Sequence, residues 1–168
     1  MVGLGLSALS IPTYYYAEQR KGRYFKSVIL GAMQITSVLV VAKGLDHKGI
    51  LANTGFVLGL TSGRLLPENT FGPDVTDGDG SKHRFLTNIG HYVREAGQSK
   101  LQTLRKEFAD HPDVTVVDYT DDAAPADYKT YEENLAKHKG EEIVYRAIHI
   151  FGPEEIVVPK TKNLSMFK

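Results

Sequence analysis

The segment "ITSVLVVA", residues 35–42, constrains the fold of this chain more than any other feature. It is rich in β-branched side chains, and the turn "KGLDHK" and a second apolar segment follow it directly. A strand that is apolar at successive positions is buried on both faces, as in the centre of an α/β sheet. In the second segment, apolar side chains recur at helical spacing from Ile50 to Leu58, and Gly63 is suited to end a helix. The sequence therefore predicts a buried strand, a charged turn and a helix as the first structural unit.

Further strands and helices alternate along the rest of the chain. The predicted strands are residues 35–42, 114–119, 143–151 and 164–167, with only a short strand or turn around residues 86–93. The predicted helices are residues 50–63, 93–110, 127–138 and 153–158, the last of them ended by Pro159. Residues 65–85, dense in Gly, Pro, Asp and Asn, predict a loop. This order indicates an α/β fold, a three-layer sandwich with a mixed four-stranded sheet.

The N-terminal residues 1–34 differ in composition and are predicted to be an apolar, helical extension of the domain formed by residues 35–168. No acidic residue precedes Glu18, and four basic residues follow within the next eight positions. These charges come after the apolar run, which is the reverse of a secretory signal, whereas a basic, acid-poor leader is typical of a mitochondrial address. A helix is expected from Tyr14 to Met33. The side chains expected to contact a protein partner, with membrane proximity as the alternative for the tyrosines, are Leu4, Leu6, Leu9, Tyr14, Tyr15 and Tyr16.

Composition excludes several classes of function. The chain has 20 basic and 20 acidic residues, so its net charge gives no overall attraction to nucleic acid. It has no cysteine, which rules out disulfides, a thiolate zinc site and a cysteine nucleophile. The apolar stretch Ser27 to Ala42 is shorter than the ~20 residues of a membrane-spanning helix, and we expect a helix end followed by a core strand there.

Two stretches resemble the type-2 peptidyl-tRNA hydrolases. In the first, "KGLDHKGILAN", Ala52 and Asn53 fall on the Ala-Gln pair with which that family's helix begins. The second, "IFGPEEIVVPKTKNLSMF", is similar to the family's last strand, Gly-Pro turn, short helix and terminal strand. The middle segments "GPDVTDGDGSKH", "VVDYTDDA" and "TYEENLAKH" resemble an uncharacterised, mostly bacterial domain family of the same fold. Together these matches imply a peptidyl-tRNA hydrolase-like fold for residues 35–168.

The departures from the hydrolase pattern concern the residues that the resemblance implies for catalysis. The family's lysine position falls on Gly49, beside Lys48; its histidine position falls on Phe56; its aspartate position falls on Val158. Glycine, phenylalanine and valine side chains neither transfer a proton nor orient a water. We therefore expect that peptidyl-tRNA hydrolysis by the family's route is lost.

Two other groups of residues are candidates for catalysis. In the first turn, His47 is suited to act as a general base and Lys48 to contact a phosphate or oxyanion; Asn53 joins them through the resemblance. The alternative is that Asp46 caps the helix and that His47 and Lys48 face water.

The second group lies in "DVTDGDGSKH", where Asp74, Asp79 and His83 are suited to polarise a water or bind a divalent metal. The alternative is a polar turn in which Asp side chains cap backbone amides and Gly78 and Gly80 adopt positive φ. The calcium-loop pattern fails, because its first position would be Val75 and its twelfth Leu86. No metal site and no cofactor are predicted.

The sequence thus leaves two hypotheses from different classes. The first is a non-catalytic accessory subunit of a larger, mitochondrial assembly, which contacts its partner through the N-terminal extension and has lost the hydrolase chemistry. The second is a hydrolase of an ester or acyl substrate that uses His47 and Lys48 or Asp79 and His83. RNA binding without hydrolysis is a third option and requires basic side chains gathered on one face.

Overall fold

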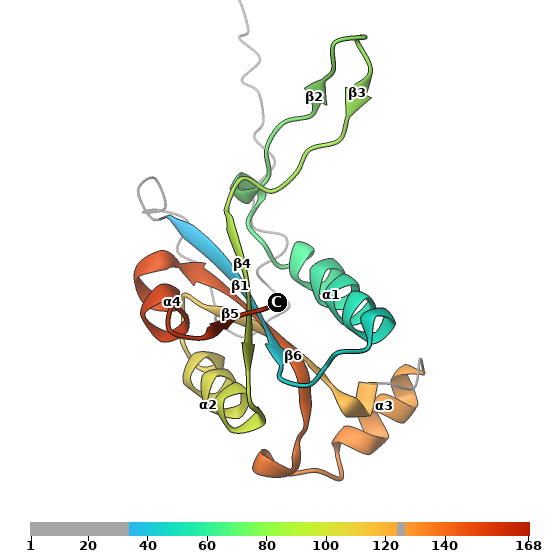
Figure 1. Ribbon diagram of the computed structural model, residues 1–168, viewed down its shortest axis with the longest axis vertical. Helices are drawn as coiled ribbons and strands as arrows, with labels where there is room; N and C mark the ends of the chain where they lie inside the picture. The colour runs from blue at the N-terminus through green and yellow to red at the C-terminus, as the bar shows by residue number, and fades with distance from the viewer. Residues whose placement is uncertain (1–33, 124–126) are drawn as a thin grey trace, which may run out of the picture.

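A computed structural model describes residues 34–123 and 127–168 of the chain (Figure 1). The N-terminal helix and the partner-binding residues predicted before Gln34 therefore lie outside the described residues. The described part is an α/β domain, which confirms the predicted class. Its main sheet has five strands in the order β5-β6-β1-β4-β7, where the sequence predicts four, and a separate two-stranded sheet joins β2 and β3.

Strands and α-helices alternate along only part of the chain, because β2, β3 and β4 follow one another without an α-helix between them. The strands are β1 (Ile35–Ala42), β2 (Val75–Thr76), β3 (Lys82–His83), β4 (Gly90–Ala96), β5 (Thr115–Thr120), β6 (Tyr145–Pro153) and β7 (Ser165–Met166). The α-helices are α1 (Lys48–Gly63), α2 (Gln98–Ala109), α3 (Tyr128–Leu135) and α4 (Glu154–Thr161). The described residues also form three short 3₁₀ helices, at Glu68–Thr70, Asp121–Ala123 and Gly140–Glu142.

Strand β1 is the centre of the sheet, as its apolar sequence predicts. It pairs in parallel with β4 and antiparallel with β6, so the sheet is mixed. Side chains at alternate positions of β1 enter two different cores. Val38, Val40 and Ala42 pack with α2 and Val157 of α4, whereas Val41 packs with Leu58 of α1. Helices therefore cover both faces of the sheet, α2 and α4 on one face and α1 on the other (Figure 1).

Strand β4 (Gly90–Ala96) lies where the sequence predicts only a short strand or turn, around residues 86–93. Residues 90–95 are exposed or half-buried, because on its outer side β4 pairs only with the two-residue strand β7. A strand near the edge of a sheet needs no continuous apolar pattern, and without that pattern the helix was predicted to begin at Val93. The structure shows that β4 continues to Ala96 and that α2 begins at Gln98, after Gly97 in extended conformation.

Two smaller expectations are wrong for local reasons. Pro159 does not end α4 but lies inside it, and the helix continues to Thr161. The carbonyl that Pro159 leaves without a helical partner belongs to Glu155, which is exposed and can bind water. The loop predicted for residues 65–85 includes the β2–β3 hairpin, which projects beyond the end of the main sheet (Figure 1).

Gly152 lies near the end of β6, where that strand packs closely on the loop before β5, and a substitution there tests this packing. A Cβ atom there would lie 2.8 Å from the Asp113 carbonyl oxygen and 3.0 Å from Cγ2 of Val114. We expect Gly152→Ala to lower the free energy of unfolding by about 1–3 kcal/mol, because backbone must move to accept the methyl group. Gly55→Ala is the matched control: its Cβ meets nothing within 4 Å in the middle of α1, so it should raise stability by about 0.5–1 kcal/mol. Urea denaturation of both variants measures the difference, and two similar values would contradict the packing described for Gly152.

Candidate functional site

The first turn holds His47 in a structural role. His47, not Asp46, is the N-cap of α1, and its Nδ1 accepts a hydrogen bond from the backbone N–H of Ile50 at 3.3 Å. The expectation that Asp46 caps the helix is therefore wrong: imidazole Nδ1 can accept from an N-terminal amide as a carboxylate would. Lys48 is exposed in the first turn, and among the described residues no ion pair involves His47 or Lys48. Asn53 lies one turn further on, where its Nδ2 donates to the Tyr119 hydroxyl at 3.4 Å.

The acidic loop forms the β2–β3 hairpin, and its residues pair differently from the expectation. Nε2 of His83 lies 2.9 Å from a carboxylate oxygen of Asp77, not of Asp79. The other oxygen of Asp77 accepts from the backbone N–H groups of Asp79 and Ser81. These bonds, led by that from His83, lower the pKa of Asp77.

The hairpin geometry matches the polar-turn alternative in part. Gly80 has φ +83°, as that alternative predicts, whereas Gly78 does not adopt positive φ. Asp74 instead accepts from the Arg84 side chain and the Phe85 amide. Within the described residues, no group of three or more His, Asp or Glu side chains could hold a metal ion.

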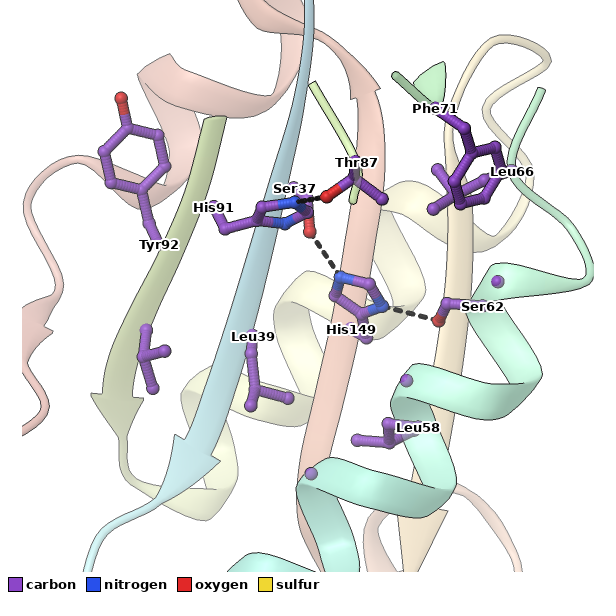
Figure 2. Close-up of a pocket in the computed structure, with 14 residues that line it drawn as sticks. Ser37, Leu39, Leu58, Ser62, Leu66, Phe71, Thr87, His91, Tyr92 and His149 are labelled. Carbon is purple, nitrogen blue, oxygen red and sulfur yellow. Dashed lines mark hydrogen bonds between the residues drawn. The ribbon is translucent and has the colours of Figure 1, made fainter. Parts of the chain in front are cut away.

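A pocket of about 350 Å³ lies elsewhere, between α1 and the sheet (Figure 2). Its floor is formed by β1, β4 and β6, one wall by the C-terminal half of α1, and its upper end by Leu66 and Phe71. The lining residues are Ser37, Leu39, Gly55, Leu58, Gly59, Ser62, Gly63, Leu66, Phe71, Thr87, His91, Tyr92, Val93 and His149. Because Gly55, Gly59 and Gly63 follow at intervals of one helical turn, α1 presents bare backbone to the pocket and leaves space that side chains would fill.

His149 lies at the polar end of the pocket and joins the sheet to the helix. Its Nε2 is 2.5 Å from Ser37 Oγ on β1, and its Nδ1 is 2.5 Å from Ser62 Oγ on α1 (Figure 2). Both serines are buried, with exposed fractions of 2% and 1%. A second pair, Thr87 and His91, is hydrogen-bonded at the more exposed side of the pocket.

The environment of His149 keeps its imidazole uncharged. Burial, together with the smaller effect of the nearby His91, lowers the pKa of His149 to about 4. Desolvation penalises the charged ring, and no carboxylate lines the pocket to compensate. At neutral pH the ring is therefore neutral, with one nitrogen donating and the other accepting.

The sequence prediction named none of the three residues Ser37, Ser62 and His149 as a site. They are far apart in the chain, and Ser37 stands inside the apolar segment 35–42. The sequence contains one signal for this site. His149 stands between the apolar residues Ile148 and Ile150 of β6, and a histidine in a buried strand must find buried hydrogen-bond partners. None of the earlier candidates His47, Lys48, Asn53, Asp79 and His83 lines this pocket.

Comparison with known proteins gives a family without an assigned activity. The chain belongs to the DUF2000 family of proteins of unknown function, whose model matches residues 36–168. It is also similar to the solved structure of the protein of unknown function Atu0240 from Agrobacterium tumefaciens strain C58. The TM-score is 0.67 at 12% sequence identity, over 81% of this chain and 99% of that one, so the likeness shows the fold alone. No curated protein matches the sequence significantly.

His149 predicts a pH dependence of stability. The unfolded chain takes up a proton on this residue near pH 6.5, whereas the folded protein does so only near pH 4. The contribution of His149 is therefore complete above about pH 6.5 and is lost as the pH falls from there toward 4, by at most about 3 kcal/mol. Denaturation of the parent and of His149→Gln between pH 4 and 7 should show a shallower pH slope for the variant, since the carboxylates act in both. Equal slopes would contradict the burial described for this ring.

Proposed function

We propose that this domain binds a small, neutral, mostly apolar molecule in the pocket between α1 and the sheet. The observation that carries the proposal is the lining itself: the described residues that form it have apolar and hydroxyl side chains or are histidines and glycines, and none of them is Lys, Arg, Asp or Glu. Ligand pockets are typically concave and apolar with a few placed polar groups, and this volume is at the lower end of their range of about 300–1,000 Å³. A charged ligand would lose its hydration here without gaining an ionic partner.

Binding fits the polar end of the pocket better than turnover does. Ser37 and Ser62 each touch His149, as a nucleophile touches its general base. However, a base whose pKa is about 4 is far from the value near 7 that favours proton abstraction at neutral pH. Both hydroxyls are also almost fully buried, which restricts attack on a substrate. Hydrolysis of a bound ester remains the alternative, to be detected as product in the same binding experiments.

The ancestry proposed for the domain is peptidyl-tRNA hydrolase-like, with the chemistry lost. Phe56 is 66% exposed on α1, and Val158 belongs to α4 on the opposite face of the sheet. The first of these positions faces water and the second lines a smaller cavity of about 170 Å³ with Arg94, Glu154 and Lys162. Because Phe56 and Val158 lie on opposite faces of the sheet, they do not form one site. This supports the proposal that the domain does not use that family's chemistry.

An accessory subunit is the second candidate function, favoured by the outer face of α1. From Gly49 to Gly63 the helix has no charged residue, and its side chains Phe56 and Leu60 are 66% and 63% exposed. Surface helices normally carry polar side chains on their outer face, so this face is suited to an apolar protein partner. In this proposal residues 1–34 add to the contact, and the assembly is mitochondrial. Within the described residues, no helix is long and apolar enough to span a membrane.

The first proposal predicts selection by charge. We expect the full chain to bind heptan-2-one, and to bind hexanoate and heptylammonium, of matched size, at least tenfold more weakly, because the pocket offers no counter-charge. NMR titration of ¹⁵N-labelled protein measures all three and should show shifts around His149.

The matched variants for that titration differ in one position on the same helix. Gly59→Leu places a side chain in the open space of the pocket and should abolish binding, whereas Ala52→Leu adds the same side chain outside it and should not. Binding of the ionic probes as tightly as of the ketone, or binding unaffected by Gly59→Leu, would count against the proposal.

The second proposal predicts loss of a partner without loss of folding. Phe56→Ser with Leu60→Ser should release proteins that co-purify with the full chain, because the apolar contact area is removed. Both side chains are exposed, so the melting temperature should change little. Tyr128→Ser, at a position 77% exposed on α3, is the control and should retain the partners. Quantitative mass spectrometry compares the proteins that co-purify with the parent chain and with the two variants, and cell fractionation tests the mitochondrial location. Identical sets of partners in all three purifications would refute the contact through α1.

A further inference from the structure

The polar end of the pocket contains more hydrogen-bond donors than its own bonds can use. Ser37 and Ser62 contribute one hydroxyl hydrogen each, and a neutral His149 contributes one N–H. The two bonds within this group, Ser37 to Nε2 and Ser62 to Nδ1, require one hydrogen each. Three hydrogens serve two bonds, so one hydroxyl hydrogen is left over.

The surplus does not depend on which tautomer His149 adopts. If Nδ1 carries the hydrogen, it donates to Ser62, Ser37 donates to Nε2, and the hydrogen of Ser62 is spare. If Nε2 carries it, the hydrogen of Ser37 is spare. A protonated ring would donate to both serines and leave two hydroxyl hydrogens spare, so at least one remains in every case.

The spare hydroxyl has no other acceptor in the described part of the chain. The side chains of Ser37 and Ser62 form no hydrogen bond there except those to His149. Both are buried to 98% or more, and both line the pocket. A buried donor without a partner is costly, so whatever fills this end of the pocket is selected for its ability to accept.

The other polar groups of the lining do not alter this selection. Thr87 and His91 bond each other on the exposed side, where water can satisfy the remaining donor. Tyr92 lies on β4 and, in Figure 2, points away from the His149 group. Among the described residues that line the pocket there is no carboxylate to take the spare hydrogen.

We infer that the ligand of this pocket carries an uncharged hydrogen-bond acceptor, most simply a carbonyl oxygen, that accepts from the spare hydroxyl of the Ser37–His149–Ser62 group. The inference rests on the proposed function, because it presumes that the pocket binds a small molecule. It narrows the ligand class to apolar ketones, esters and amides, with the carbonyl at the Ser37–His149–Ser62 group and the apolar body along α1 beside Gly55, Leu58 and Gly59.

The test compares heptan-2-one with 2-methylhept-1-ene, in which a CH₂ group replaces the carbonyl oxygen at nearly the same shape. After correction for the water–alkane partition of the two probes, the ketone should bind the full chain at least about tenfold more tightly, the value of one hydrogen bond. The infrared carbonyl band of the bound ketone should lie at lower frequency than in hexane, as expected for a hydrogen-bonded carbonyl.

The variants assign that bond to the two serines. Ser37→Ala with Ser62→Ala should move the carbonyl band, since only an imidazole N–H then remains at this end, whereas Thr87→Val should leave the band unchanged. If ketone and alkene bind equally and the band stays at its hexane position, the inference fails while the binding proposal stands. If neither probe binds, the binding proposal itself fails. A band that is shifted in the parent but unmoved by the double serine variant would overturn the assignment to these hydroxyls.

Discussion

Burial of β1 on both faces and along both edges is the constraint on which the rest of this structure depends. The strand is hydrogen-bonded to β4 and β6, and Val38, Val40 and Val41 are almost completely removed from water. A strand this apolar is stable only where helices cover both faces of the sheet, so the burial of β1 requires both α1 and α2. The same placement brings Ser37, a polar residue near the start of the strand, into the interior, where it must have a partner.

The partner it finds explains why the pocket lies where it does. His149 on the neighbouring strand bonds Ser37 on one side and Ser62 on the other, so it connects the sheet to the last turn of α1. Beside this connection the helix presents Gly55 and Gly59, whose missing side chains leave the space unfilled. A helix held at its C-terminal end by a polar bridge, but with glycines along its inner edge, encloses a cavity instead of closing onto the sheet. Protein interiors normally exclude such space, and this supports the proposal that the pocket holds a ligand.

Much of the fold follows from the sequence, because its signals are local. Continuous apolar character gives β1, and Asp127 gives the start of α3, whose first amides it caps through Lys129 and Thr130. The extent of β4 cannot be predicted in this way, because its residues have no continuously buried face. From Val93 on, the apolar residues also recur at helical spacing, which predicts a helix instead of a strand. The site does not follow either: residues 37, 62 and 149 become neighbours only through the crossover from β1 to α1 and the antiparallel return of β6. A charged turn such as "LDHK" is conspicuous in a sequence, whereas a histidine within a core strand is easily counted as part of the core.

The two ends of α1 therefore have different roles. At its N-terminus His47 caps the helix through its side chain. At its C-terminus Ser62 takes part in a buried hydrogen-bonded group that lines a cavity. In this chain the buried group that the pocket surrounds lies one full helix length from the charged turn that is prominent in the sequence. The family resemblance draws attention to the turn before α1. The group at the C-terminal end of α1 is found only by counting hydrogen-bond donors and acceptors in the structure.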